Sequence, residues 1–478
     1  MRSTLVLTLF VAFAYVGFVP TTAPTTAQVA TTKALQFGTN IRLTGPFDQN
    51  ETAIAVSPKS PRNLVAVFQG LLAAGDSFQS CGFGFTTDGG KSWTSGGKTP
   101  LERAGDVCGD PSVAADAQGN FYVSYVEIAP SSPVIEPDVV VAKSTDGGKT
   151  FATISVAVNN VVGDPNTPFP DKEFLAVDSG ASSPFQGTIY VGYTNISDAG
   201  DQIEVVVSRD SGTTWSIPAI IGAPAPRERF GEIGRLGALP VVAPDGTAYI
   251  FYAEFPRGSG PLSIRFSKST DGGFTWSQHA EVASGLPSPG LFQLKNADPL
   301  FDKPQGTGLF ANSLPTAAAA PDGTVSVAWV DFPQGSCKNA PCCVTRPPCS
   351  NSDVRLSVSR DAGRSWTAPV KVTDETNASD QFLPWIAVHP GGLLSLVWQD
   401  RRLDPSNINY DTFYTNTADG ATFLPNVRVT STTSLLGTRT FIGDYNGLAV
   451  TSDGIFPAWT DTRSGDEDIF TAVGTLPR

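Results

Sequence analysis

Histidine is scarce in this sequence, which holds two His among 478 residues. His279 follows a predicted hairpin and His389 lies in a Pro-Gly turn, so we expect both side chains on the solvent-exposed surface. A Ser-His-Asp triad needs a histidine base, and a multi-His metal site needs several His ligands. The scarcity of His argues against both kinds of site and leaves carboxylates, Tyr and Arg to carry any catalysis.

Positive charge is also scarce, since 32 Lys and Arg stand against 45 Asp and Glu and give a formal net charge of −13 at pH 7. Nucleic acids and anionic membranes bind basic surfaces. We therefore expect no nucleic-acid and no membrane partner. The acidic run Asp466-Glu467-Asp468 lacks the spacing of an EF-hand loop, so we interpret it as a solvated turn and predict neither a metal nor a cofactor.

The N-terminal apolar run, Leu5 to Val19, has about 15 residues and is too short for the roughly 20 that span a bilayer. It follows Met1-Arg2 and leads into Thr- and Ala-rich sequence that ends near Ala27. Charged, apolar and small-residue zones in this order are typical of a secretory signal peptide. The sequence predicts a signal peptide over residues 1–27, one domain over residues 28–478, and a secreted protein.

A short sequence motif recurs six times along the chain: an Asp in a Gly-containing turn, followed by Ser or Thr and an aromatic residue. A clear copy runs from Ser269 to Trp276, and a degraded one from Thr417 to Phe423. The Asp residues of the six copies are Asp88, Asp146, Asp210, Asp271, Asp361 and Asp419. Each copy follows a β-rich run, which places it at a hairpin. We expect the Asp to accept backbone N–H bonds, the Gly to supply positive φ, and the aromatic ring to pack under its hairpin.

The motif Ser-x-Asp-x-Gly-x-Thr-Trp resembles the Asp-box, or bacterial neuraminidase repeat, of sialidase-like β-propellers. The copies cover almost the whole chain after the predicted signal peptide. The resemblance implies an all-β fold, namely a single β-propeller of four-stranded blades with the boxes on its outer rim, away from the active site. It also implies activity on carbohydrates.

Seven apolar segments have the position of an inner strand, although there are six Asp-boxes. They are residues 52–57, 111–116, 173–178, 239–244, 315–321, 383–389 and 446–451. The N-terminal segment Phe37 to Thr44 resembles Phe423 to Thr430, the predicted outer strand of the sixth unit, so we expect it to complete the seventh. This arrangement would leave no free sheet edge. Seven blades closed by the N-terminal strand are favoured over the six typical of sialidases.

Cysteine usage agrees with export, because the number of Cys is six and even. Four of them crowd into one Pro-rich stretch: Cys337, Cys342, Cys343 and Cys349. This leaves Cys81 and Cys108 to pair across one blade. Three connectivities stay open for the cluster, and we favour disulfides over zinc because of the predicted secretion and the absence of a neighbouring His.

In a propeller, the residues just before an inner strand and just after a second strand lie on one face, around the central channel. The residues before the inner strands are Glu51, Asp110, Asp171-Lys172-Glu173, Arg235, Asn312, Gln381 and Asp444-Tyr445. Our catalytic candidates are Asp110, Asp171 and Asp444 as proton donors and Tyr445 as a phenol. Our substrate-binding candidates are Lys172, Arg235, Arg401, Arg402 and Arg463. The alternative for Arg402 and Arg463 is an ion pair with Asp400 or Asp461.

The resemblance implies the site of a sialidase, in which three Arg hold an acidic sugar, a Tyr activated by Glu is the nucleophile and an Asp is the acid/base. The Phe-Arg-Ile-Pro motif that carries the first of those Arg is absent. One hypothesis is a secreted sialidase-like glycoside hydrolase acting on an acidic glycan. The other is a non-catalytic binding propeller that recognises a polysaccharide or a secreted protein. We expect a monomer in either case.

Overall fold

The computed structural model describes residues 35–45, 48–70, 80–129, 137–160, 168–197, 200–222, 233–256, 261–287, 291–297, 308–331 and 351–477. The predicted signal peptide and the cluster Cys337 to Cys349 lie outside these residues. Contacts group Leu35–Leu476 into one compact unit, which we call the large unit. The features below belong to the large unit.

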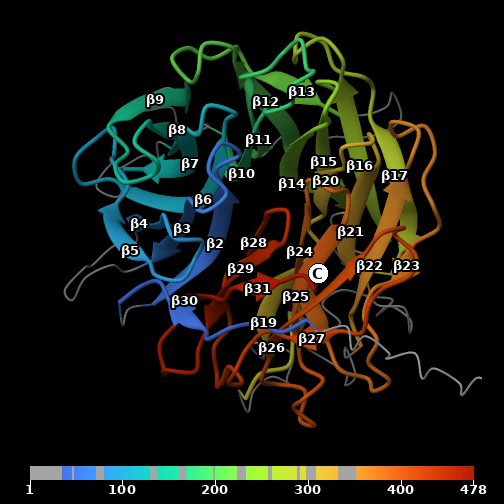
Figure 1. Ribbon diagram of the computed structural model, residues 1–478. Coiled ribbons are helices and arrows are strands. Elements are labelled where there is room, and N and C mark those ends of the chain that lie inside the picture. The colour runs from blue at the N-terminus through green and yellow to red at the C-terminus, as the bar shows by residue number, and fades with distance from the viewer. Residues whose placement is uncertain are drawn as a thin grey trace, which may run out of the picture. The chain divides into compact units, whose positions relative to one another are not determined.

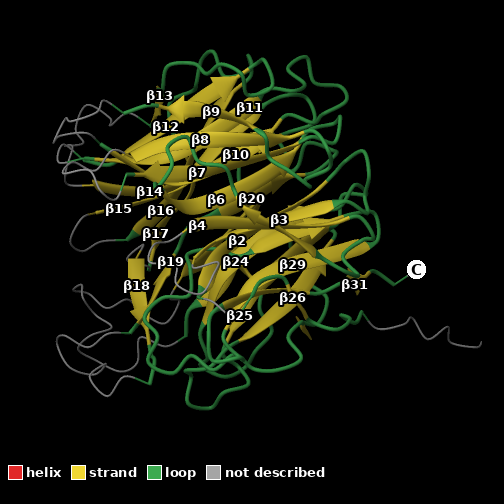
Figure 2. Cartoon of the chain, turned by 90° about the vertical axis from the view of Figure 1, so that its left-hand side faces the viewer, coloured by secondary structure: helices red, strands yellow, loops and turns green. Residues whose placement is uncertain are grey.

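Every regular element among the described residues is a β-strand (Figure 2). In this part of the chain, no helix is long and apolar enough to cross a membrane. Four sheets are four-stranded and antiparallel, each with its strands in chain order (Figure 1). The first two are β2 (Gln49–Val56), β3 (Leu64–Gly70), β4 (Ser80–Thr86), β5 (Thr94–Lys98), and β6 (Val107–Ala115), β7 (Phe121–Ile128), β8 (Pro137–Ser144), β9 (Thr153–Val158). The other two are β20 (Thr316–Ala319), β21 (Val325–Asp331), β22 (Asp353–Ser359), β23 (Val370–Lys371), and β24 (Gln381–Val388), β25 (Leu394–Asp400), β26 (Asp411–Thr417), β27 (Val427–Arg428).

An eight-stranded sheet consists of two more such units. They are β10 (Phe169–Val177), β11 (Ile189–Ile196), β12 (Gln202–Ser208), β13 (Ala219–Ile221), and β14 (Ile233–Val242), β15 (Ala248–Pro256), β16 (Leu262–Ser269), β17 (Ala280–Leu286). The two units are joined by one parallel pairing between β10 and β14, at Glu173 and Ala238. The prediction of an all-β chain with four-stranded sheets is confirmed. A separate ribbon of β18 (Leu291–Leu294) and β19 (Leu309–Asn312) lies between β17 and β20 in the chain.

The last sheet combines the two ends of the large unit. It contains β28 (Gly447–Val450), β29 (Gly454–Asp461), β30 (Asp468–Thr471), β31 (Gly474–Thr475) and the N-terminal β1 (Ile41–Arg42). Strand β1 runs antiparallel to β30, with Ile41 opposite Thr471, and Phe37 bridges to Gly474. The Arg42 side chain forms an ion pair with Asp468. The N-terminal segment is therefore a sheet strand, as the sequence predicts.

The first strands of the seven units contact one another in a cycle. The contacts join β2 to β6, β6 to β10, β10 to β14, β14 to β20, β20 to β24, β24 to β28 and β28 to β2. A buried apolar cluster fills the space between the faces of successive sheets, for example Val123 and Phe121 with Val65 and Phe83. The last sheet packs in the same way on the first, through Ile469 and Leu64. The second strands are the most buried elements, because both of their faces meet such clusters.

In the six repeated turns, which we call the Asp turns, the Asp carboxylate accepts backbone N–H groups of the turn, and the copy at Asp419 is one residue shorter than the others. In the copy at Asp271, Oδ1 accepts the N–H groups of Phe274 and Thr275 at 3.0 Å, and Oδ2 accepts the Thr275 hydroxyl at 2.6 Å. The Ser269 hydroxyl donates to the same carboxylate at 2.7 Å, and Gly273 has φ of 81°. The Thr275 hydroxyl is the largest cause of a pKa of about 2 for Asp271. The expected role of the Asp as a turn-forming acceptor is confirmed.

The closing aromatic rings also reach the preceding sheet. The Trp366 ring contacts Phe251 and Phe266, at centroid distances of 6.1 and 5.6 Å, and both belong to the preceding sheet. The Trp215 indole N–H donates to Ser155 Oγ at 3.0 Å, again on the preceding sheet. Trp93, for its part, lies against Gly84 of its own hairpin. The closing rings thus also connect neighbouring sheets, which the sequence did not indicate.

The expectation of an exposed His389 is also wrong, because this side chain is buried. Its Nδ1 lies 2.6 Å from the Thr451 carbonyl oxygen, so Nδ1 donates, and Nε2 accepts from Ser395 Oγ at 2.8 Å. Burial lowers the pKa of His389 from its ordinary value. The ring is a neutral bridge between two sheets, which the sequence of a Pro-Gly turn does not reveal.

Candidate functional site

Three first strands carry a residue of positive φ at a break in their register. The residues are Glu51, Asp110 and Lys172, with φ of 51°, 54° and 53°. The register of the pairing shifts at each of these positions, in β2, β6 and β10. Such bulges redirect a side chain, and positive φ in a non-Gly residue costs about 1–3 kcal/mol. The backbone therefore holds three charged side chains in an unfavourable conformation that brings them together.

Lys172 is the centre of this group. Its Nζ lies 2.8 Å from Asp110 Oδ1, 3.2 Å from Glu51 Oε1 and 2.7 Å from Asp444 Oδ2. We call Glu51, Asp110, Asp171, Lys172 and Asp444 the acidic cluster. Burial acts to lower the pKa of Lys172, but the carboxylates around it raise the pKa well above its ordinary value. The ammonium stays charged.

The carboxyl groups of the acidic cluster differ strongly in pKa. Burial acts to raise the pKa of Asp110, but the charge of Lys172 and hydrogen bonds with Glu51 and Lys172 together outweigh burial and lower it to about 2. Burial, together with the charge of Asp110, raises the pKa of Asp171 to about 7. Burial and Asp110 also raise the pKa of Glu51 well above its ordinary value. Asp110 is thus a carboxylate beside a carboxyl group, Asp171, that is poised to give or take a proton near neutral pH.

Two further side chains adjoin the acidic cluster. Tyr445 is buried and donates its hydroxyl to the Pro111 carbonyl oxygen at 3.2 Å. Its ring packs at 5.2 Å from that of Phe174. Glu173 is fully buried, its carboxyl oxygens have no hydrogen-bond partner among the described residues, and burial raises its pKa well above the ordinary value. Burial of Glu173 therefore favours its protonated form.

The same bulge position is uncharged in two other four-stranded units. Gly237 and Leu383 have positive φ, 75° and 49°, at the register shifts of β14 and β24. The charged groups therefore gather on the first strands of three consecutive units, β2, β6 and β10, with Asp444 before β28. The arrangement is asymmetric, and it concentrates acid and base groups at one place.

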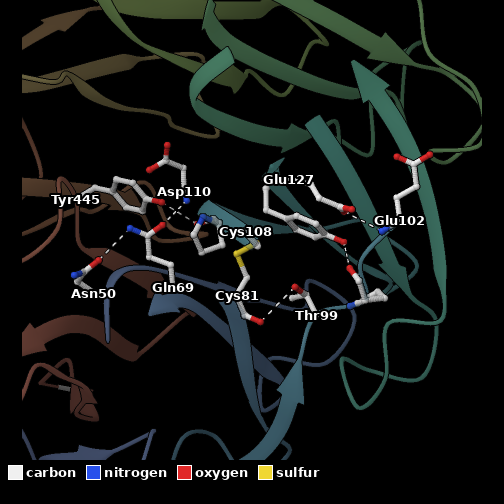
Figure 3. Close-up of a disulfide and its surroundings, with 12 residues drawn as sticks. Asn50, Gln69, Cys81, Thr99, Glu102, Cys108, Asp110, Glu127 and Tyr445 are labelled. Carbon is white, nitrogen blue, oxygen red and sulfur yellow. Dashed lines mark hydrogen bonds between the residues drawn. A yellow bond between two sulfur atoms is a disulfide. The ribbon is translucent and has the colours of Figure 1, made fainter. Parts of the chain in front are cut away.

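A network next to the disulfide fixes the backbone of Asp110 (Figure 3). Gln69 Oε1 accepts the Asp110 N–H at 2.7 Å, and Gln69 Nε2 donates to Asn50 Oδ1 at 3.1 Å. The predicted pairing of Cys81 with Cys108 is confirmed. We expected this disulfide to lie within one blade. It joins β4 to β6 and therefore connects two neighbouring sheets.

The five substrate-binding candidates differ in their surroundings. Lys172 lies in the acidic cluster. Arg235 is buried, with its Nε 2.8 Å from Glu254 Oε2. Arg401 is fully buried, donates to the Asn407 carbonyl oxygen at 3.0 Å, and stacks over Phe382 at 5.2 Å from the ring centroid.

Arg402 and Arg463 occupy equivalent surroundings. Arg402 Nη2 lies 2.7 Å from Asp400 Oδ2, and the guanidinium stacks over Phe413 at 4.4 Å. Arg463 Nη2 lies 2.5 Å from Asp461 Oδ2, and its guanidinium stacks over Phe470 at 4.6 Å. Both ion pairs that the sequence left as the alternative are present.

The structure brings together Asp110, Asp171, Lys172, Asp444 and Tyr445 from the set of candidates. Sequence reasoning placed Glu51 and Glu173 on the same face without selecting them. It missed Gln69, which lies inside an ordinary apolar second strand. The one signal for Gln69 in the sequence was a polar residue at the end of a run of apolar residues. Residues 332–350, which contain the cysteine cluster, lie outside the described residues.

Neither a family model nor a curated protein sequence matches this chain. Solved structures do resemble it. One is an ulvan lyase of polysaccharide lyase family PL25, bound to -[GlcA(1-4)Rha3S]-, with a TM-score of 0.53 and 12% identity over 91% of this chain and 95% of the lyase. The likeness shows the fold alone, which is consistent with a β-propeller.

Two further structures are less similar. A Hadza microbial sialidase has a TM-score of 0.47 and 17% identity over 83% of this chain and 73% of its own. An α-L-arabinofuranosidase of Fusarium graminearum, in complex with an iminosugar inhibitor, has a TM-score of 0.46 and 14% identity over 79% of this chain and 96% of its own.

Proposed function

We propose that this chain is a secreted, sialidase-like glycoside hydrolase of the Asp-box propeller family, with the acidic cluster as its active site. In this proposal residues 1–27 are a signal peptide and residues 28–478 form one propeller domain of seven blades, closed by the N-terminal strand. The six Asp turns support the family, because all of them use an Asp and a preceding hydroxyl in one geometry. The cycle of first-strand contacts and the pairing of β1 with β30 support the blade count and the closure.

The observation that carries the proposal is the separation of two pKa values, about 2 for Asp110 and about 7 for Asp171. Most glycosidases use one carboxyl group that keeps its proton and one that stays ionised, whereas sialidases replace the second by a Tyr nucleophile. Asp171 would protonate the departing glycosidic oxygen as the bond from that oxygen to the anomeric carbon breaks. The Asp110 carboxylate would act on the anomeric centre, and water would supply the hydroxyl that completes hydrolysis.

The substrate part of the proposal is an acidic glycan. A substrate carboxylate needs a cation, and Lys172 is the cationic member of the acidic cluster. The ammonium of Lys172 already contacts three carboxylates, and Arg402 and Arg463 are ion-paired with Asp400 and Asp461. An acidic sugar would have to compete with these carboxylates for a cation. The assay therefore includes neutral glycosides as well as acidic ones.

The test is hydrolysis of a panel of aryl glycosides that includes an aryl sialoside. We expect turnover of at least one substrate, with a rate that falls as the pH rises through about 7, because Asp171 then loses the proton it must donate. Asp171→Asn should abolish turnover with an unchanged thermal melt, and the exposed Glu281→Gln is the matched control. No turnover on any substrate, or full activity of Asp171→Asn, would refute the proposal.

A second candidate function, a non-catalytic binding propeller, is favoured by one observation. The Lys172 side chain is 11% exposed and bonded to three carboxylates, as in a structural ion network. In that case a polysaccharide or a secreted protein would bind the surface without being changed. Saturable binding of a polysaccharide together with no turnover on the panel would decide for this function.

A further inference from the structure

A cavity of about 300 Å³ opens between two neighbouring sheets, and none of its lining residues belongs to the acidic cluster. It is lined by the end of β9, by β11 and β12, and by the turn before β13. Its lining also includes Pro170, which immediately precedes Asp171 on β10. This volume is at the lower end of the range of small-molecule sites, which is roughly 300–1,000 Å³. The cavity fits a ligand of about the size of one sugar residue.

A buried carboxyl group lies in the wall of this cavity. Glu204 is 7% exposed, and no described residue forms an ion pair with it. The Tyr193 hydroxyl donates to Glu204 Oε2 at 2.6 Å, and Asn195 Nδ2 donates to Oε1 at 2.9 Å. A carboxylate offers about four acceptor positions, so about two of them stay open after these bonds.

The amide groups of the wall add more acceptors. Asn160 Nδ2 donates to the carbonyl oxygens of Pro137 and Pro168, and Asn195 Nδ2 donates to Glu204. These bonds orient both amides, because only the NH₂ side can face an oxygen acceptor. The oxygens Oδ1 of Asn160 and Asn195 are then left for a ligand. Glu204, Asn160 and Asn195 therefore face the cavity mainly with acceptor positions.

We propose that this cavity binds an amino sugar, with the ammonium of the sugar against Glu204. An ammonium group has three donors and one positive charge, which matches an acceptor-rich wall that carries a carboxylate. Asn159 is exposed at the rim and can bond the sugar hydroxyls with both sides of its amide. The site binds independently of whether the acidic cluster hydrolyses a glycosidic bond.

The test compares three probes by isothermal titration calorimetry at mildly acidic pH: a glucosamine tetrasaccharide, an N-acetylglucosamine tetrasaccharide and hexalysine. We expect saturable binding of the glucosamine tetrasaccharide. Acetylation removes the charge of the amine, so the N-acetylated probe should bind about tenfold more weakly or not at all. Hexalysine carries the charge without the sugar and should not compete.

Substitution locates the site. Glu204→Gln should weaken binding of the glucosamine tetrasaccharide by about tenfold, since it removes the charge and keeps the shape. Glu281→Gln, an exposed carboxylate outside the cavity, should leave binding unchanged. If Glu204→Gln does not fold, the comparison of the two tetrasaccharides on the wild-type protein still decides. Equal affinity for both tetrasaccharides, no binding of either, competition by hexalysine, or unchanged affinity in a folded Glu204→Gln variant would overturn the proposal.

Discussion

At the scale of single residues, the unit Trp-x-Asp-x-Arg occurs twice with the same contacts. The Trp398 indole N–H donates to Asp400 Oδ2 at 2.7 Å, and Trp459 donates in the same way to Asp461 at 2.9 Å. Each Asp thus accepts from an indole and from an arginine. The arginine in turn covers an aromatic ring, so acid, base and two rings form one packed group at the end of a second strand.

We predict that Arg402→Met combined with Arg463→Met lowers stability. Each substitution leaves a buried aspartate without its cation, and loss of one partner of a buried pair costs about 3–5 kcal/mol. Thermal and urea unfolding of the double variant measure the effect. A melt like that of the wild-type protein, with loss of ligand binding or turnover, would show instead that the two guanidiniums serve the substrate.

The sequence predicted most members of the acidic cluster because topology alone brings residues before first strands to one face. It did not indicate their close contact. The bulges at Glu51, Asp110 and Lys172 are formed by non-Gly residues, so no glycine marks the positive φ that makes the side chains converge. The choice between binding and ion pairing for Arg402 also depends on burial, which a pattern of charges does not reveal.

At the scale of elements, the Asp turn both closes a hairpin and supplies a ring to the neighbouring sheet. The repeat could be read from the sequence, because the hydrogen bonds within it are local. The partner of the ring could not be read from the sequence, since it lies about one repeat earlier in the chain. Trp366 contacts Phe251 and Phe266, and the residues between Phe266 and Trp366 belong to other elements.

We predict that Trp366→Ala lowers the free energy of unfolding by about 3 kcal/mol, at the lower end for aromatic truncations because the ring is only half-buried. The loss should come from the contact between two sheets. Chemical denaturation measures it, and substitution of the exposed Phe274 in another Asp turn, Phe274→Ala, is the control. A midpoint that stays the same in Trp366→Ala would show that the ring does not join the sheets.

At the scale of the whole molecule, the N-terminal segment is part of the last sheet. Asn40 Nδ2 donates to the Val429 carbonyl oxygen at 3.0 Å, Arg463 Nη2 donates to Asn40 Oδ1 at 3.1 Å, and the Phe37 ring lies 5.4 Å from that of Tyr414. We predict that deletion of Phe37 to Thr44 prevents stable folding, because it removes β1 and exposes the edge of β30. A chain that begins at Leu35 is the control. Soluble protein with an unchanged melt after the deletion would contradict the proposed closure.

Glu467 gives the large unit a pH-dependent contact. Asn50 Nδ2 donates to Glu467 Oε2 at 2.9 Å, which joins the first sheet to the last. Burial raises the pKa of Glu467 to about 7. A carboxyl group whose pKa is raised by folding stabilises the protein fully below its unfolded pKa, and this contribution is lost as the pH rises through the folded pKa.

We therefore predict that Glu467→Gln, which mimics the protonated form, gains stability relative to the wild-type protein as the pH rises from about 5 to about 8, by on the order of 2 kcal/mol. Melting temperatures of both proteins across this range measure the difference. Glu281→Gln should follow the wild-type curve. A constant difference between Glu467→Gln and the wild-type protein would show that Glu467 does not titrate as proposed.

The pairing of β1 with β30 also sets the order of events during synthesis. The ion pair between Arg42 and Asp468 spans 426 positions in the chain, so β1 leaves the ribosome long before its partner exists. At about 5–20 residues per second, the delay is roughly 20–90 s. During this time β1 has no strand to pair with, while the six four-stranded units between β1 and β30 can form one after another. The last sheet can be completed only after β30 has been synthesised, which makes the joining of the two ends the final step of folding.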